Sequence, residues 1–133
     1  RLDRSIFEVG QLCGRAFGKI YIKEDADLRG RKPGDAAEIL YRGAVNGGAS
    51  RKEIEIIRSE TLALQAALDN ALPGDLIMMF YENFESNYKL ILDYLKILDV
   101  QSAVAERDGA VPYIQAVTPG EISGKEVALR VVQ

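Results

Sequence analysis

The chain has 133 residues, of which 47% are hydrophobic and 28% charged, enough for one folded domain with a sizeable core. Its net charge of −3 and the lack of a basic stripe argue against nucleic-acid binding, and no apolar run approaches the ~20 residues of a membrane span. The single cysteine, Cys13, cannot form an internal disulfide, and no signal peptide opens the chain, so we expect a cytoplasmic protein. Because residue 1 is not methionine, we also expect a piece of something longer.

The chain opens with a helical pattern. Ser5 and Glu8 fit a capping box, which predicts a helix from Ser5 to a stop at Gly18. Cys13 lies on the apolar stripe of this helix. Because no histidine or basic residue stands beside it in the sequence, we interpret it as a small core residue rather than a nucleophile.

A short strand over 19–23 is predicted next, and a densely charged loop follows it. The next helix begins near Pro33, since proline is tolerated in a first helical turn. Glycines at 47 and 48 end it, and a C-cap with a linker is favoured over a phosphate-binding loop. Small residues recur on this helix at a spacing suited to close packing on a sheet: Ala36, Ala37, Leu40 and Ala44.

The second half continues the alternation. A strand is predicted over 53–57, although these residues could also extend the following helix, for which Ser59 is the N-cap. The run LIMMF at 76–80 is continuously apolar, which is typical of a strand covered on both faces. A helix is predicted from Phe84 to Leu98, and residues 127–132 could form a last strand.

This order of elements indicates an α/β fold. We expect a three-layer, Rossmann-like domain with a mostly parallel sheet flanked by helices, which lacks its first strand or strands. An exposed sheet edge left in this way could pair with a second copy, so a homo-oligomer is one expectation.

Several kinds of catalytic centre are excluded by composition. The chain contains no histidine, so it cannot build a Ser-His-Asp or Cys-His system or a zinc site with the usual ligands. It also lacks the GxxxxGK[ST] phosphate loop. Magnesium at Asp25 and Asp27 is conceivable, but no loop signature supports it. We therefore expect the catalytic centre to be incomplete within this chain.

If the predicted strands are parallel, the residues that follow them meet at one edge of the sheet. Both signs of charge are present there, which suits a zwitterion such as an amino acid, because arginine can hold a carboxylate through two parallel hydrogen bonds. The alternative, which the pattern alone favours, is a set of solvated loop charges in weak surface pairs. The residues concerned are Asp25, Asp27, Arg29, Arg31, Ser59, Glu60, Tyr81, Glu82, Asn83 and Glu85.

Two further groups of charges have two interpretations each. The spacing of Glu82 and Glu85 places them at a helix entry, where the helix dipole favours negative charge, rather than in a glycosidase-like acid–base pair. Arg1 and Asp3 precede the first helix and either contact a ligand or belong to a frayed end.

The runs IYIKEDADLRGRKPGDAAEILYRG and SETLALQAALDNALPGDLIMMFYENFE resemble the C-terminal domain of Mur-type ligases, and within that family the cyanophycin synthetases. RLDR at 1–4 looks like the continuation of the GDR-like turn of these enzymes. The resemblance covers residues 1–98. Residues 99–133 have no counterpart in it and are expected to form a C-terminal extension with an extra strand.

The resemblance implies an ATP-dependent ligase that forms amide bonds with an amino-acid or peptide acceptor. In this family a central domain binds MgATP and a carboxylate is phosphorylated. The acceptor amine then attacks the acyl phosphate, while the C-terminal domain closes and helps to hold the acceptor. Carried over residue by residue, acceptor binding falls on Asp27, Arg29, Arg31, Glu82 and Glu85. Arg1 and Asp3 would lie near the nucleotide.

The chain also departs from the family. The phosphate loop, the magnesium-holding residues and the D-Y-x-H-N-type segment are missing. We therefore expect ATP and magnesium to bind in the central domain of the same parent chain, and this piece alone to be inactive, with no catalytic residue or metal ligand. The alternatives are the corresponding lobe of a peptidoglycan-precursor ligase and a non-enzymatic Rossmann-like binding or oligomerisation module.

Overall fold

A computed structural model describes residues 2–108, 113–116 and 126–132, with side chains up to residue 97. The chain divides into two compact units, Arg1–Ala63 and Leu64–Gln133. Arg1, predicted to lie near the nucleotide, falls outside the described residues. Among those residues, no helix is both long and apolar enough to cross a membrane.

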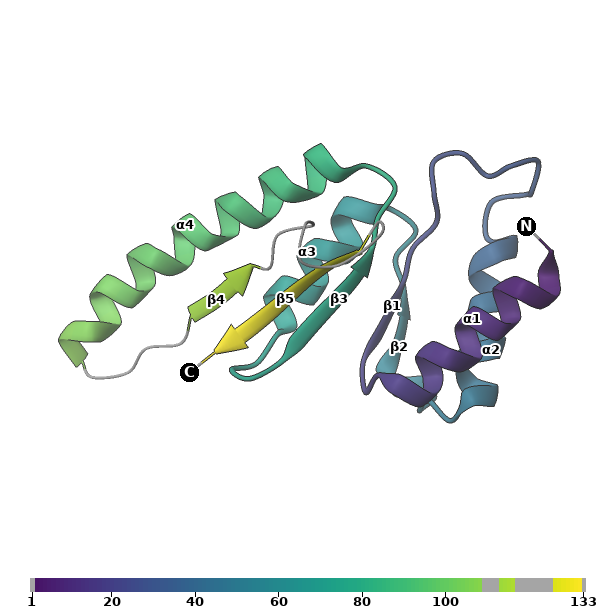
Figure 1. Ribbon diagram of the computed structural model, residues 1–133, viewed down its shortest axis with the longest axis horizontal. Coiled ribbons are helices and arrows are strands. Elements are labelled where there is room, and N and C mark those ends of the chain that lie inside the picture. Colours follow the sequence, from purple (N-terminus) through teal and green to yellow (C-terminus); the bar gives the residue numbers. More distant parts are fainter. Residues whose placement is uncertain (1, 109–112, 117–125, 133) are drawn as a thin grey trace. The chain divides into compact units, whose positions relative to one another are not determined.

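The first unit combines two helices with a small parallel sheet (Figure 1). Ile20 and Ile22 of β1 pair with Ile54 and Ile56 of β2 in parallel, as predicted for these two strands. Its elements are α1 (Asp3–Ala16), β1 (Ile20–Ile22), α2 (Asp35–Gly47), the short 3-10 helix η1 (Arg51–Glu53), β2 (Ile54–Ile56) and the start of α3 (Glu60–Asn70).

The core of this unit forms where α2 packs on the sheet. Ala37 and Ala44 are buried against Ile22 and Ile54, and Leu40 packs on the same cluster, so the predicted packing role is confirmed for these three residues of α2. The α1 start predicted at Ser5 is wrong. The backbone N–H of Ile6 donates to the carbonyl of Leu2 at 3.2 Å, so the helix begins earlier and Ser5 lies inside it.

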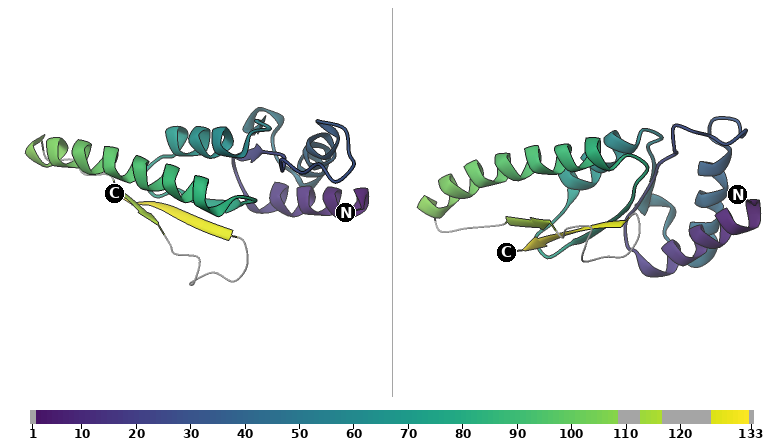
Figure 2. Two further views of the ribbon diagram at one scale, coloured as in Figure 1. Left: turned by 90° about the horizontal axis from the view of Figure 1, so that it is seen from above. Right: turned by 45° about the horizontal axis from the view of Figure 1, so that its top comes forward.

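The other side of α2 packs on α1, and glycines make this contact very close. A Cβ atom on Gly10 or Gly14 of α1 would overlap the backbone of α2, and one on Gly43 would overlap the carbonyl of Phe7. The two helices lie side by side in both figures (Figure 2). Backbone contact at this distance is available only because these residues lack side chains.

The second unit is an antiparallel sheet with helices packed on it. The strand order is β3-β5-β4, and both pairings are antiparallel. Leu64, Leu68, Met79 and Ile91 form its buried core, and α4 lies along the sheet in each view (Figure 2). The unit contains the rest of α3, β3 (Leu76–Phe80), α4 (Phe84–Asp108), β4 (Tyr113–Ala116) and β5 (Glu126–Val132), the last in the segment where a final strand was expected.

The α/β class is confirmed, but two details of the predicted sheet are wrong. In the described residues only β1 and β2 pair in parallel, because β3 belongs to a separate antiparallel sheet. β3 is also not covered on both faces: Met79 is 9% exposed, whereas Leu76 is 56% and Phe80 is 49% exposed. An unbroken apolar run does not reveal its partner strand, and here that partner lies in a stretch of weak pattern near the end of the chain.

Candidate functional site

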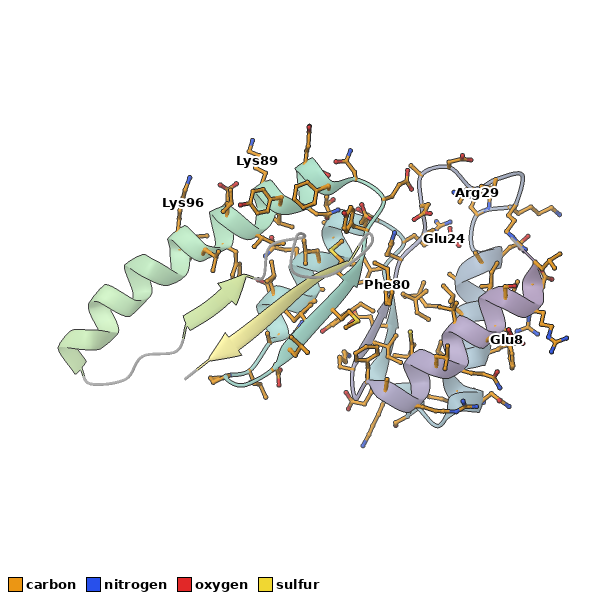
Figure 3. All side chains as sticks on the ribbon, in the orientation of Figure 1. Glu8, Glu24, Arg29, Phe80, Lys89 and Lys96 are labelled. Atoms are coloured by element: carbon orange, nitrogen blue, oxygen red, sulfur yellow. The ribbon has the colours of Figure 1, made fainter. Side chains whose placement is uncertain are left out.

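The candidate site is the charged loop between β1 and α2, residues 24–34. Glu24, the first residue of this loop, joins the two ends of the loop (Figure 3). The Oε1 atom of Glu24 accepts hydrogen bonds from the backbone N–H of Gly34 at 2.9 Å and of Ala37 at 3.2 Å, and Oε2 lies 3.2 Å from the same Gly34 nitrogen. Gly34 is the N-cap of α2, with φ of 92°, and has no side chain with which to cap the helix. Glu24 therefore supplies the capping carboxylate from ten residues away.

The tip of the loop is a tight turn around Arg29. The Oδ1 atom of Asp27 accepts the backbone N–H of Arg29 at 2.9 Å, and the N–H of Arg31 donates to the carbonyl of Leu28 at 3.0 Å. Arg29 has a left-handed φ of 50°, which is uncommon for a residue with a side chain. Its side chain is exposed. The turn thus holds the Arg29 backbone in a strained conformation and leaves its guanidinium in solvent.

A second contact fixes the side of the loop. The Nη2 atom of Arg31 lies 2.6 Å from Oδ1 of Asp3, at the start of α1. The Arg31 side chain is 23% exposed and that of Asp3 is 75% exposed. The sequence placed Arg31 in the acceptor site and Asp3 near the nucleotide, whereas the structure brings the two into one ion pair.

Lys23 connects the carboxyl ends of β1 and β2. Its Nζ atom contacts Asp25 at 2.6 Å and Glu60 at 2.8 Å. Burial lowers the lysine pKa, but the hydrogen bonds and charges of the two carboxylates outweigh it, and the pKa of Lys23 is raised above its ordinary value. The loops after these two strands therefore meet at one edge, as predicted for a parallel pair.

The remaining predicted residues gather at the start of α4 in the second unit. Glu82 and Glu85 are exposed, and Glu85 lies in the first turn of α4, as its spacing predicted. Asn83 accepts the backbone N–H of Ser86 at 3.1 Å and so caps this helix. The rings of Phe84 and Tyr88, whose centroids are 5.2 Å apart, stack beside them.

Two clusters are therefore present, one in each unit. Asp27, Arg29 and Arg31 share the charged loop, whereas Glu82 and Glu85 flank the start of α4. Ser59 lies just before α3, and its Oγ atom accepts the N–H of Leu62 at 3.4 Å, which confirms it as the predicted N-cap.

Neither Glu24 nor Lys23 was assigned a role from the sequence. The available signal for Glu24 was Gly34, because a helix that begins after a glycine needs a capping oxygen from elsewhere. Cys13 is half-buried, and burial raises the pKa of its thiol, which supports its interpretation as a core residue.

Comparison with known proteins finds relatives for about two thirds of the chain. The chain is 37% identical over 93 residues to a cyanophycin synthetase of Synechocystis sp., with 68% of this chain and 10% of the relative covered. It is 33% identical over 91 residues to that of Crocosphaera subtropica, again with 68% and 10% covered. For Geminocystis herdmanii the identity is 30% over 94 residues, with 71% and 11% covered.

The chain contains a cyanophycin synthetase-like domain. The predicted resemblance to cyanophycin synthetases is thereby confirmed. The chain spans about one tenth of the length of these curated relatives. No protein-family model matches the chain, and no solved structure matches it.

Proposed function

We propose that the chain is the acceptor-binding C-terminal lobe of an ATP-dependent, amide-bond-forming ligase of the Mur type, one that acts on amino acids in the cytoplasm. The observation that carries this proposal is the homology to cyanophycin synthetases over 68% of the chain. Residues 1–98 would form the lobe and residues 99–133 an extension of it.

The charged loop has the chemistry that an amino-acid acceptor needs. The planar guanidinium of Arg29 can donate two parallel hydrogen bonds to a carboxylate. The Asp27 carboxylate already accepts the Arg29 N–H, and a carboxylate has lone pairs for further donors, such as an ammonium group. We also propose, on the resemblance alone, that Glu82 and Glu85 bind the acceptor.

The implied cofactors, ATP and magnesium, do not fit the described residues. Those residues contain no group of three or more acidic or cysteine side chains that could hold a metal ion. The whole sequence also lacks a GxxxxGK[ST] loop. We therefore assign both cofactors to a central domain of the same parent chain.

The test is Arg29→Ala in the full-length enzyme, with ligation measured at varied acceptor concentration. Loss of a bidentate charged contact should lower kcat/KM for the acceptor by about 30- to 1000-fold, or about 2–4 kcal/mol. Arg42→Ala is the matched control, because Arg42 is an exposed arginine of α2 whose nearest carboxylate, on Glu38, is 3.9 Å away. Unchanged acceptor kinetics in Arg29→Ala would remove Arg29 from the site. Absence of ATP-dependent ligation in the unaltered enzyme would overturn the proposed function.

A further inference from the structure

We propose that Glu24 is a positioning residue for acceptor binding, which holds the loop bearing Asp27 and Arg29 in its binding conformation. This inference rests on the proposed function, since it concerns how the same loop is held. None of the hydrogen bonds of Glu24 described above is with Asp27 or Arg29. It acts on them through the loop base, by joining the end of β1 to the beginning of α2.

Glu24 makes bonds at both ends of the loop. Its backbone N–H donates to the carbonyl of Arg58 at 3.0 Å, which ties it to the chain after β2. Its partly buried carboxylate then accepts the N–H groups of Gly34 and Ala37. One residue thus fixes both ends of the loop, and its negative charge lies at the helix end that favours it.

The Arg31–Asp3 and Lys23–Asp25 pairs are weaker anchors of the loop than Glu24. The Arg31–Asp3 ion pair depends on an Asp3 side chain that is 75% exposed, and exposed pairs of this kind contribute little. The Lys23–Asp25 pair joins residues only two apart and does not span the loop. Without Glu24, the loop that carries the Arg29 turn would lose its side-chain bonds to the start of α2.

A loop that is not held must be ordered when the acceptor binds, and the free energy of that ordering is subtracted from affinity. The expected effect of losing Glu24 is therefore weaker acceptor binding, with little change in the step that follows. Binding of the other substrates should also be unchanged. A general loss of folding would instead reduce the concentration of active enzyme and lower kcat without selecting one substrate.

The experiment compares Glu24→Ala, Glu24→Gln and Asp35→Ala in the full-length enzyme. Asp35 is the matched control, because its exposed carboxylate also lies in the first turn of α2 but makes no bond across the loop. For Glu24→Ala we expect the acceptor KM to rise about 10-fold, with kcat and the ATP KM within about 2-fold. Glu24→Gln should show about a 3-fold rise, because an amide oxygen still accepts an N–H, and Asp35→Ala should show no rise.

Hydrogen exchange provides a readout that does not depend on activity. In Glu24→Ala, but not in Asp35→Ala, the amides of residues 25–37 should exchange faster, while those of α1 should keep their protection. If Glu24→Ala yields too little folded enzyme, the kinetics and hydrogen exchange of Glu24→Gln test the positioning role instead.

Three outcomes separate the inference from the proposed function. If Arg29→Ala raises the acceptor KM but both Glu24 variants leave it unchanged, the positioning role is wrong and the function stands. Equal losses for all substrates in the Glu24 variants also overturn it. If Arg29→Ala itself changes nothing, Arg29 is removed from the acceptor site and the role of Glu24 in holding it is overturned, while ATP-dependent ligation by the unaltered enzyme would still support the proposed function.

Discussion

Lys23 illustrates how the surroundings of one residue set its charge state. Its ammonium group lies between two carboxylates, those of Asp25 and Glu60, and its side chain is 17% exposed. Burial opposes the charged form, but the two ion pairs more than offset it and the pKa is raised. The folded protein therefore holds this proton more tightly than the unfolded chain, so the ion pairs contribute to stability.

We predict that this contribution disappears in alkali. A raised folded-state pKa gives stability that is fully present below the unfolded value, about 10.5, and is lost as the pH rises through the folded value. The difference in unfolding free energy between the unaltered protein and Lys23→Gln should be constant from about pH 7 to about pH 10 and then shrink. Urea denaturation at each pH measures it.

Lys19→Gln is the control for this series, because Lys19 lies 3.8 Å from Glu55 and is 40% exposed. Its effect should be small at every pH. A Lys23→Gln difference that persists undiminished through about pH 12 would contradict the ion-pair account.

At the scale of elements, the contact between α1 and α2 shows that small residues allow two helix backbones to touch. Ala37 and Ala44 bury one side of α2 on the sheet, whereas Gly43 faces the backbone of α1. The two helices approach until backbone meets backbone, which leaves no room for a methyl group.

We predict that Gly43→Ala destabilises the first unit by about 1–3 kcal/mol. The added Cβ meets the carbonyl of Phe7, which belongs to the backbone and cannot move aside as a flexible side chain would. The free-energy cost of this overlap should exceed the ~1 kcal/mol that alanine gains over glycine as a helix former, so the net effect is destabilising. Thermal unfolding measures the change. Gly18→Ala, where a Cβ meets nothing within 4 Å, should be neutral, and equal effects at both positions would argue against the close contact.

The exposure of β3 gives a second prediction at this scale. Met79 is 9% exposed and packs with Leu64, Leu68 and Ile91, so Met79→Ala should cost about 2–5 kcal/mol. Its neighbour Met78 is 38% exposed, and Met78→Ala should cost less than about 1 kcal/mol. Chemical denaturation of both variants measures the loss of unfolding free energy on each face of β3. Equal costs would restore the sequence-based interpretation of a strand covered on both sides.

At the scale of the whole molecule, local signals predicted what local interactions determine. The helix capped by Ser59 and the strand at 76–80 follow from residues close in sequence, and both are present. The pairing of β3 with β5 was not predicted, because the partner strand lies beyond the long helix α4 in a stretch without clear periodicity. Register over such a separation depends on tertiary packing.

The residues of the candidate site were predictable only in part. Charge density and the resemblance identified Asp27 and Arg29, and the parallel β1–β2 pair brings the loops after those strands together at Lys23 and Glu60. The sequence did not reveal Glu24, since its role depends on the left-handed backbone of Gly34 and on a helix that begins without a cap of its own. Long-range side-chain to backbone bonds leave no periodic signature in a sequence.

The chain should not turn over ATP by itself in the presence of amino acids. Acceptor recognition requires only a few charged groups on a held loop, whereas phosphoryl transfer needs a phosphate cradle and metal-holding carboxylates. The sequence has no GxxxxGK[ST] loop and no histidine, and the described residues contain no cluster of metal-binding side chains. Phosphate release by the purified chain, checked for folding by circular dichroism, should equal the buffer background, while the full-length enzyme provides the positive control. Amino-acid-dependent release by the chain alone would mean that the catalytic machinery lies within it, and the assignment of ATP to another domain would then be wrong.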